Sequence, residues 1–132
     1  MGKTVVITGA SSGIGEALAR AWGRRGETVV LNARDGGALA RVAKDVVAVG
    51  GSAIVHPGDV TREEDRLSLV ERARRETGRI DVLVNNAGRG HYGSVARVAM
   101  GDLEALFALN VFAPLRLAQL AIDPLTRCGG RS

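Results

Sequence analysis

The 132-residue sequence predicts an α/β fold with a doubly wound parallel sheet, and three observations support this. Short runs of β-branched and aliphatic residues alternate four times with longer segments of helical apolar spacing. Glycine or polar residues follow each run, which is where ligands approach a parallel sheet. The alternation itself predicts right-handed crossovers, with helices on both faces of the sheet.

The first β-α unit begins with a strand expected at residues 4–7 and continues through a glycine-rich turn at residues 8–15. Glycines let this backbone turn tightly and approach a ligand, and the N–H groups of the following helix suit an anion. Gly26 is placed to end that helix. Its apolar positions at helical spacing are Ile14, Ala17, Leu18, Ala21 and Trp22.

The second and third units repeat this pattern, with strands expected at residues 28–31 and 53–56. The second helix ends at Gly50 and Gly51. Its apolar positions are Leu39, Val42, Val46 and Val49. Thr61 is the expected N-cap of the third helix, whose acidic first turn and basic last turns suit the helix dipole.

The fourth unit has an expected strand at residues 80–84, which ends in Asn85-Asn86-Ala87-Gly88. A long helix follows, with one predominantly apolar stripe. The stripe contains Leu103, Leu106, Phe107, Asn110, Val111, Pro114, Leu117, Ala118 and Ala121.

Composition and charge argue against several classes of partner. The net charge is +4, but the arginines lie at helix ends without interleaved aromatic residues, so we expect no nucleic-acid partner. No stretch is expected to reach the apolar length of a membrane span, and the N-terminus lacks a signal-peptide pattern. We therefore expect a cytoplasmic protein with no membrane partner. The single cysteine, Cys128, is expected to be an unreactive thiol, and no ligand spacing predicts a metal site.

Four glycine or polar clusters at successive strand ends predict a dinucleotide site at the carboxyl edge of the sheet. They are residues 9–15, 32–35, 59–60 and 85–88. No Gly-Lys-Ser/Thr closes the first cluster, so it is not a nucleoside-triphosphate loop. Plain turns remain the structural alternative, above all at Asn85 and Asn86.

The spacing Gly-x-x-x-Gly-x-Gly at residues 9–15, together with Asn85-Asn86-Ala87-Gly88, resembles the classical branch of the short-chain dehydrogenase/reductase family. Asp59-Val60 and Asn110-Val111 match further motifs of that family in the same order. The resemblance covers the whole chain. It implies a single NAD(P)-binding domain over residues 1–132, a Rossmann-like doubly wound parallel sheet truncated after the fourth β-α unit.

The resemblance also implies the phosphate end of a cofactor site. The turn would be shaped by three glycines, Gly9, Gly13 and Gly15. Groups for the phosphates would come from Ser11, Ser12 and Ile14.

The adenine end of that site is implied in the same way. Asp59 would accept a hydrogen bond from the adenine amino group, and Val60 would lie beside the ring. The adenine-ribose side would be lined by Asn86, Ala87 and Gly88, which would also brace the central strands.

The tip of the second strand favours NADP over NAD. A carboxylate there would bind the ribose 2′-hydroxyl, whereas a guanidinium would hold a 2′-phosphate. Ala33 stands where the NAD-preferring members of the family carry an acid, and Arg34 resembles the basic residue of the NADP-preferring members. Asp35 could still be the ribose acid, but its place before the second helix makes it a natural cap.

Asn110 is the candidate catalytic residue. Pro114, four residues later, has no N–H for the Asn110 carbonyl, so that carbonyl is expected to bind something else. In the resembling family, an asparagine at this motif belongs to an Asn-Ser-Tyr-Lys set and holds a water in the proton relay. The alternative is a buried amide that is satisfied within the helix.

The rest of that catalytic set is missing from this sequence. The only tyrosine, Tyr92, is followed four residues later by Ala96, so no Tyr-x-x-x-Lys occurs. Tyr92 and His91 are expected near the substrate entrance. Residues 127–132 resemble the turn that leads into the family's fifth strand, so the fourth strand is expected to have an unpaired edge.

The resemblance implies an NADP-dependent oxidoreductase acting on a small alcohol or carbonyl substrate, with this chain inactive by itself. A non-catalytic NADP-binding or partner-docking module and a truncated gene product are the alternatives. The long fourth helix resembles one used for subunit packing in the family, which is consistent with a homo-oligomer.

Overall fold

The computed structural model describes residues 2–88 and 99–128, with side chains described as far as residue 122. His91, Tyr92, Ala96 and the side chain of Cys128 therefore lie outside the described part. The strands are β1 (Thr4–Thr8), β2 (Thr28–Asn32), β3 (Ser52–Val55) and β4 (Val82–Val84). The helices are α1 (Gly13–Arg24), α2 (Gly36–Ala48), α3 (Glu63–Thr77), α4 (Met100–Phe107), the π-helical turn η2 (Ala108–Phe112) and α5 (Ala113–Cys128).

The four strands form one parallel sheet in the order β3-β2-β1-β4, which confirms the predicted doubly wound architecture. The chain moves outward from β1 to β3 and then crosses to the other side of β1 to form β4. The direction of winding therefore reverses between β1 and β4. In such sheets this is the place where ligands bind.

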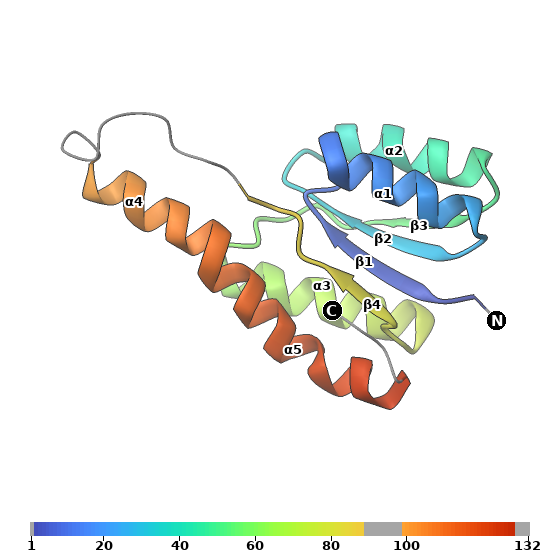
Figure 1. The fold of residues 1–132 in the computed structure, drawn as a ribbon. Helices are drawn as coiled ribbons and strands as arrows, with labels where there is room; N and C mark the ends of the chain where they lie inside the picture. The colour runs from blue at the N-terminus through green and yellow to red at the C-terminus, as the bar shows by residue number, and fades with distance from the viewer. Residues whose placement is uncertain (1, 89–98, 129–132) are drawn as a thin grey trace.

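Helices cover both faces of the sheet (Figure 1). As a result, every residue of the central strand β1 is buried. Val5 and Ile7 pack with the apolar residues of α1 and α2, whereas Val6 packs with those of α3 and α5. Alternate side chains of a strand point to opposite faces, so one short strand contributes to two hydrophobic clusters. The continuous Val and Ile run is typical of a central parallel strand.

Helix α1 buries only part of its predicted apolar positions, because Leu18 and Trp22 are half-buried against the core while the others are exposed. Gly15, Ala19 and Gly23 are the buried positions, while Ile14 is 72% exposed. Ala17 and Ala21 are exposed too. Small residues bring α1 close to its neighbours, since a Cβ on Gly23 would lie only 3.1 Å from a methyl carbon of Val46 on α2. The apolar pattern therefore detected the helix and the core contacts of Leu18 and Trp22, but not the fully buried small residues.

Thr61 does not cap α3, contrary to the sequence expectation. The N-cap is Arg62, which makes no side-chain capping hydrogen bond. The Thr61 hydroxyl instead donates to Asp59 Oδ1 at 2.6 Å. A threonine two residues after an aspartate can satisfy the Asp side chain as readily as a helix end.

The predicted long helix is observed as α4, η2 and α5 in unbroken succession (Figure 1). Its apolar stripe is divided: Ala113, Leu117 and Ala121 are buried, whereas Phe107 and Val111 are exposed. The wider π turn, which contains Val111, separates Phe107 from the buried residues of α5 and changes the direction in which later side chains face. Arg127 and Cys128 continue α5, so the turn expected from residue 127 does not begin there.

The expectation that no segment has the apolar length of a membrane span is wrong. Among the described residues, the helix Met100–Ile122 is long enough and apolar enough to cross a membrane, judged by length and composition only. The core helix of a soluble protein can pass the same test. Here α5 packs against α3 and β4 through Ala113 and Leu117, so part of its apolar surface belongs to the core.

Asp81 ties the start of β1 to the start of β4. It is 5% exposed, and its carboxylate accepts hydrogen bonds from the Thr4 backbone N–H at 2.8 Å and from Arg79 at 2.6 and 2.8 Å. Burial alone would raise the pKa of Asp81, but these donors hold it below its usual value. The stabilisation is therefore present above the unfolded-state pKa and is lost as the pH falls through the lower folded-state pKa.

We predict that Asp81→Asn lowers the free energy of unfolding by about 1–3 kcal/mol at pH 7, the range for hydrogen bonds to a charged group. The difference from wild type should shrink as the pH falls below the usual carboxyl value of 3.8. Urea unfolding at a series of pH values measures both effects. Glu76→Gln, which removes an exposed partner of Arg72, is the control. A pH-independent difference would contradict the role of the Asp81 charge.

Candidate functional site

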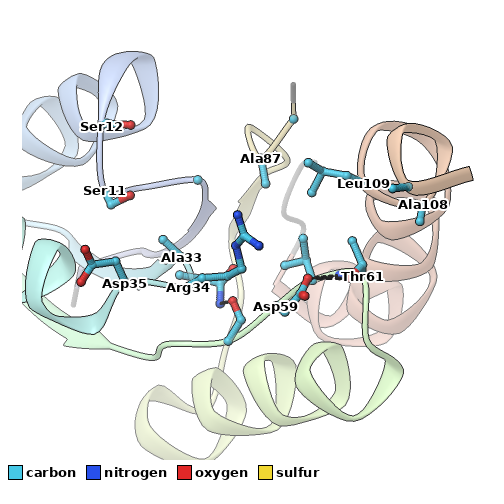
Figure 2. A pocket seen from close by; sticks show the side chains of 16 residues that line it. Ser11, Ser12, Ala33, Arg34, Asp35, Asp59, Thr61, Ala87, Ala108 and Leu109 are labelled. Carbon is cyan, nitrogen blue, oxygen red and sulfur yellow. Dashed lines mark hydrogen bonds between the residues drawn. The ribbon is translucent and has the colours of Figure 1, made fainter. Parts of the chain in front are cut away.

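A cavity of about 570 Å³ lies at the carboxyl ends of the strands, within the usual range for small-molecule sites. Its lining comes from the segments after all four strands and from α4 and η2 (Figure 2). Eight of the candidate residues meet there: Gly9, Ser11, Ser12, Arg34, Asp59, Val60, Ala87 and Gly88. Gly13, Ile14, Gly15, Asn86 and Asn110 are not part of the lining.

The turn after β1 requires glycine for two different reasons. Gly9 and Gly13 have φ angles of 63° and 57°, a conformation that L side chains rarely adopt. Gly15 is needed for space, because a Cβ there would lie 2.1 Å from the Gly9 carbonyl oxygen and 2.6 Å from Asn86 Nδ2. A Cβ on Gly13 would meet nothing within 4 Å. Gly13 thus leaves open space at the helix start, while Gly15 is closely packed.

Helix α1 begins beside the cavity with features that suit an anion. Ser12 is the N-cap, and its side chain makes no capping hydrogen bond. Figure 2 shows Ser11 and Ser12 together at the α1 side of the cavity. The first backbone N–H groups of a helix attract negative charge. This end of the cavity therefore has the donor chemistry that a cofactor phosphate requires.

Asn86 supports the wall of the cavity from behind. Its side-chain amide donates to the Gly9 carbonyl at 3.1 Å. The Thr8 hydroxyl oxygen accepts from the backbone N–H groups of Asn86 and Ala87 at 3.1 and 3.0 Å. Asn85 donates to the Pro114 carbonyl at 3.3 Å and so connects the same loop to α5. The paired asparagines therefore bind neighbouring segments, which a plain turn would not require.

Arg34 and Asp35 are adjacent in sequence but have different environments. Figure 2 shows the Arg34 side chain reaching into the cavity, toward Ala87. Asp35 caps α2, because its side chain accepts from the Ala38 backbone N–H at 3.1 Å. The capping role expected for Asp35 is confirmed. Both residues line the cavity, but Asp35 is engaged at the start of α2, so Arg34 is the side chain of the pair that reaches toward Ala87.

Asp59 also lines the cavity and is held by Thr61. The Thr61 hydroxyl and backbone N–H both donate to Asp59 Oδ1, at 2.6 and 2.9 Å. The hydroxyl bond is the main reason that the pKa of Asp59 lies below its usual value, and the charge of Arg34 lowers it further. Asp59 therefore presents an ionised carboxylate, a hydrogen-bond acceptor, to the cavity at neutral pH.

Asn110 lies in η2, outside the cavity lining but next to one of its walls. The backbone N–H of Ala113 bonds to the Ala108 carbonyl, five residues earlier, so the helix is wider here. A Cβ on Gly88 would lie 3.1 Å from Asn110 Oδ1. Asn110 is exposed, which contradicts the alternative of a buried amide.

Several lining residues could not be identified from the sequence. They are Gly58, Thr61, Ala105, Ala108 and Leu109. The spacing of Thr61 after Asp59 offered a local signal, since Asp side chains commonly bond the backbone two residues on. The helix residues have no distinguishing chemistry, and only the folded chain brings them here. Within the described residues, no group of His, Cys, Asp or Glu is arranged to hold a metal ion.

Comparison with known proteins reveals extensive similarity. The sequence profile described as short chain dehydrogenase matches residues 3–131. The ketoacyl reductase HetN of Nostoc sp. is 38% identical over 128 residues, which cover 97% of this chain and 45% of that protein. The chain spans about half the length of the curated relatives it matches.

The fold also matches solved structures over nearly the whole of this chain. A metagenomic short-chain oxidoreductase in complex with NADP has a TM-score of 0.93 and 36% identity, covering 98% of this chain and 59% of that one. L-sorbose reductase from Gluconobacter frateurii, complexed with NADPH and L-sorbose, has a TM-score of 0.92 and 34% identity, with coverages of 97% and 49%. An NADH-dependent reductase complexed with NAD has a TM-score of 0.90 and 28% identity, with coverages of 97% and 54%.

We predict opposite outcomes for two glycine substitutions in the turn. Gly15→Ala should cost at least about 3 kcal/mol of folding free energy, because its methyl group would overlap backbone. Gly13→Ala should cost only about 1–2 kcal/mol, the penalty of a left-handed conformation. Thermal or urea unfolding compares the two. Equal destabilisation would show that the close contact at Gly15 is unimportant.

Proposed function

This chain belongs to the short-chain dehydrogenase/reductase family, and from that premise we propose that it forms the NADP-binding part of an oxidoreductase. The complete enzyme would transfer hydride between nicotinamide and an alcohol or ketone carbon. The observation that carries the proposal is the cavity at the winding reversal, into which Arg34 extends.

The preference for NADP rests on the different environments of Arg34, which extends into the cavity, and Asp35, which caps α2. A guanidinium can hold a phosphate by two parallel hydrogen bonds. Asp35, the only acid at the tip of β2, already accepts a helix N–H and is less suited to a ribose hydroxyl. NADP or NADPH in related structures supports this preference, although one relative carries NAD.

The remaining groups along the cavity are assigned from one end to the other. The phosphates would lie at the start of α1, near Ser11, Ser12 and the backbone of Ile14. Asp59 would accept from the adenine amino group, with Val60 beside the ring. Ala87 and Gly88 would line the adenine-ribose side.

The role of Asn110 in the reaction would be to hold a water through its backbone carbonyl. Its position in the widened turn, next to Gly88, supports this assignment. The bound cofactor would supply the hydride chemistry itself. The sequence contains no Tyr-x-x-x-Lys that could move the hydroxyl proton, so we also propose that this 132-residue chain binds NADP(H) without turnover.

The substrate class of the complete enzyme would be a small alcohol or carbonyl compound. L-sorbose reductase, a structural relative, is solved with such a molecule bound. A non-catalytic NADP-binding module is the second candidate for the chain as it stands. The absence of the tyrosine-lysine motif from its sequence favours that candidate.

We predict that the purified chain binds NADPH more tightly than NADH and reduces no ketone at a measurable rate. Nicotinamide fluorescence titration and loss of 340 nm absorbance measure the two properties. Turnover would contradict the proposed inactivity of the isolated chain. Failure to bind either nucleotide would favour a truncated product without function over both candidates.

We further predict that Arg34→Ala weakens NADPH binding about ten- to a hundredfold, the value of a charge-assisted phosphate contact, and changes NADH binding little. Arg34→Lys should recover part of the loss, because it keeps the charge without the paired donors. Arg24→Ala, an exposed arginine at the far end of α1, is the control. Equal weakening of both nucleotides by Arg34→Ala would refute the assignment.

A further inference from the structure

Glu63, the first residue of α3, joins two parts of the molecule that are distant in sequence. Its carboxylate accepts from Arg66 Nε and Nη2 at 3.2 and 3.0 Å. It also accepts from Arg116 on α5, whose Nε and Nη2 lie 3.0 and 2.7 Å from Oε2. We call the Arg66-Glu63-Arg116 set the Glu63 bridge. Each arginine donates through two nitrogens, Arg66 to Oε1 and Arg116 mainly to Oε2, so both carboxylate oxygens are engaged by charge-assisted hydrogen bonds.

One end of the Glu63 bridge holds the loop on which the adenine is expected to lie. Arg66 Nη1 donates to the Val60 carbonyl at 2.6 Å. The Arg66 side chain is only 13% exposed, so this contact is largely shielded from water. Asp65 on the same helix accepts from the Asp59 backbone N–H at 2.7 Å. Two consecutive residues of the loop are therefore fastened to the first turns of α3.

The other end of the Glu63 bridge holds the helix that follows Asn110. Arg116 lies six residues after Asn110, in the first turns of α5. The adjoining residues Ala113 and Leu117 are buried against the sheet and α3, which limits the freedom of Arg116. The bridge thus runs from Val60, which lines the cavity, to α5, which directly follows the η2 turn whose residues Ala108 and Leu109 also line it.

The Glu63 carboxylate is ionised at neutral pH. Hydrogen bonds from Arg116 and then Arg66 lower the pKa of Glu63 to about 2. The bridge is complete above the usual carboxyl value of 4.5 and is lost only as the pH falls toward 2. It is therefore a constant feature of the protein at neutral pH.

We propose that Glu63 is a positioning residue for the cofactor, because its carboxylate couples the Val60 loop to the helix that carries Asn110. The identity of the ligand, NADP, rests on the proposed function. The way in which Glu63 acts rests on the contacts of the Glu63 bridge described above. Glu63 does not line the cavity and would act through Arg66. Loss of its charge should loosen the adenine side of the site while leaving the turn at Gly9 in place.

The test compares Glu63→Gln with Glu64→Gln. Glu64 is in the same helical turn but forms its ion pair, within the part of the chain that the structure describes, with the exposed Arg62. Both variants therefore change the charge near the helix dipole equally. The probes are 2′,5′-ADP for the adenine half and reduced nicotinamide mononucleotide for the other half. Amide hydrogen exchange of residues 59–61 in the free chain is the second measurement.

We expect Glu63→Gln to weaken 2′,5′-ADP binding about three- to tenfold, the range for a networked ion pair, without changing nicotinamide mononucleotide binding. Exchange at residues 59–61 should rise by a similar factor. Arg116→Gln should produce both effects although Arg116 does not contact the loop, and Glu64→Gln should produce neither.

Unchanged exchange at residues 59–61 in Glu63→Gln would overturn the proposal, as would an equal effect in Glu64→Gln. A rise in exchange throughout the chain would identify Glu63 as a stabilising residue only, and so would also overturn it. Failure of the wild-type chain to bind 2′,5′-ADP or NADPH would instead refute the proposed function and, with it, the ligand of the Glu63 bridge.

Discussion

The close contact between the Gly9 carbonyl and Gly15 is the constraint on which the site depends. The carbonyl oxygen occupies the space where a Gly15 side chain would be, and it accepts a hydrogen bond from Asn86. The turn after β1, the start of α1 and the loop after β4 therefore meet at one point. Because β1 and β4 flank the winding reversal, this contact also determines where the cavity opens.

The two sides of the cavity are built in different ways. The side at Gly9 and Ala87 is mainly backbone, held by the buried Thr8 hydroxyl and the Asn86 amide. The side at Arg34 and Asp59 is made of charged side chains, and the Asp59 carboxylate is held by hydrogen bonds from Thr61. Backbone contacts of this kind resist change, whereas charged side chains can alter ligand preference without altering the fold. A fold shared with NADP-bound and NAD-bound relatives is consistent with that division.

Much of the architecture could be predicted because it depends on local periodicity. The β-α alternation, the glycine turn and the clusters at strand ends are all consecutive in the sequence, and the crossover rule converts them into a sheet. Prediction failed where a choice depended on neighbours distant in the chain or on competition between two nearby partners. The fully buried positions of α1 were missed because Gly15 and Gly23 carry no apolar signal, although their small size lets the helix pack closely. Thr61 was misassigned because two local partners, Asp59 and the start of α3, compete for it.

The sequence by itself determined the order of strands and helices along the chain and the family resemblance. It also determined that Arg34 stands directly before Asp35, the cap of α2. Those features depend on residue types at fixed short spacings. Only the tertiary structure decided that Leu109 and Thr61 line one cavity, and that Glu63 binds both the nearby Arg66 and Arg116, which is 53 residues further along the chain than Glu63. Such contacts arise from the packing of α5 on α3. No short-range sequence pattern predicts that packing, because the free energy that stabilises it comes from the burial of many small apolar surfaces at once.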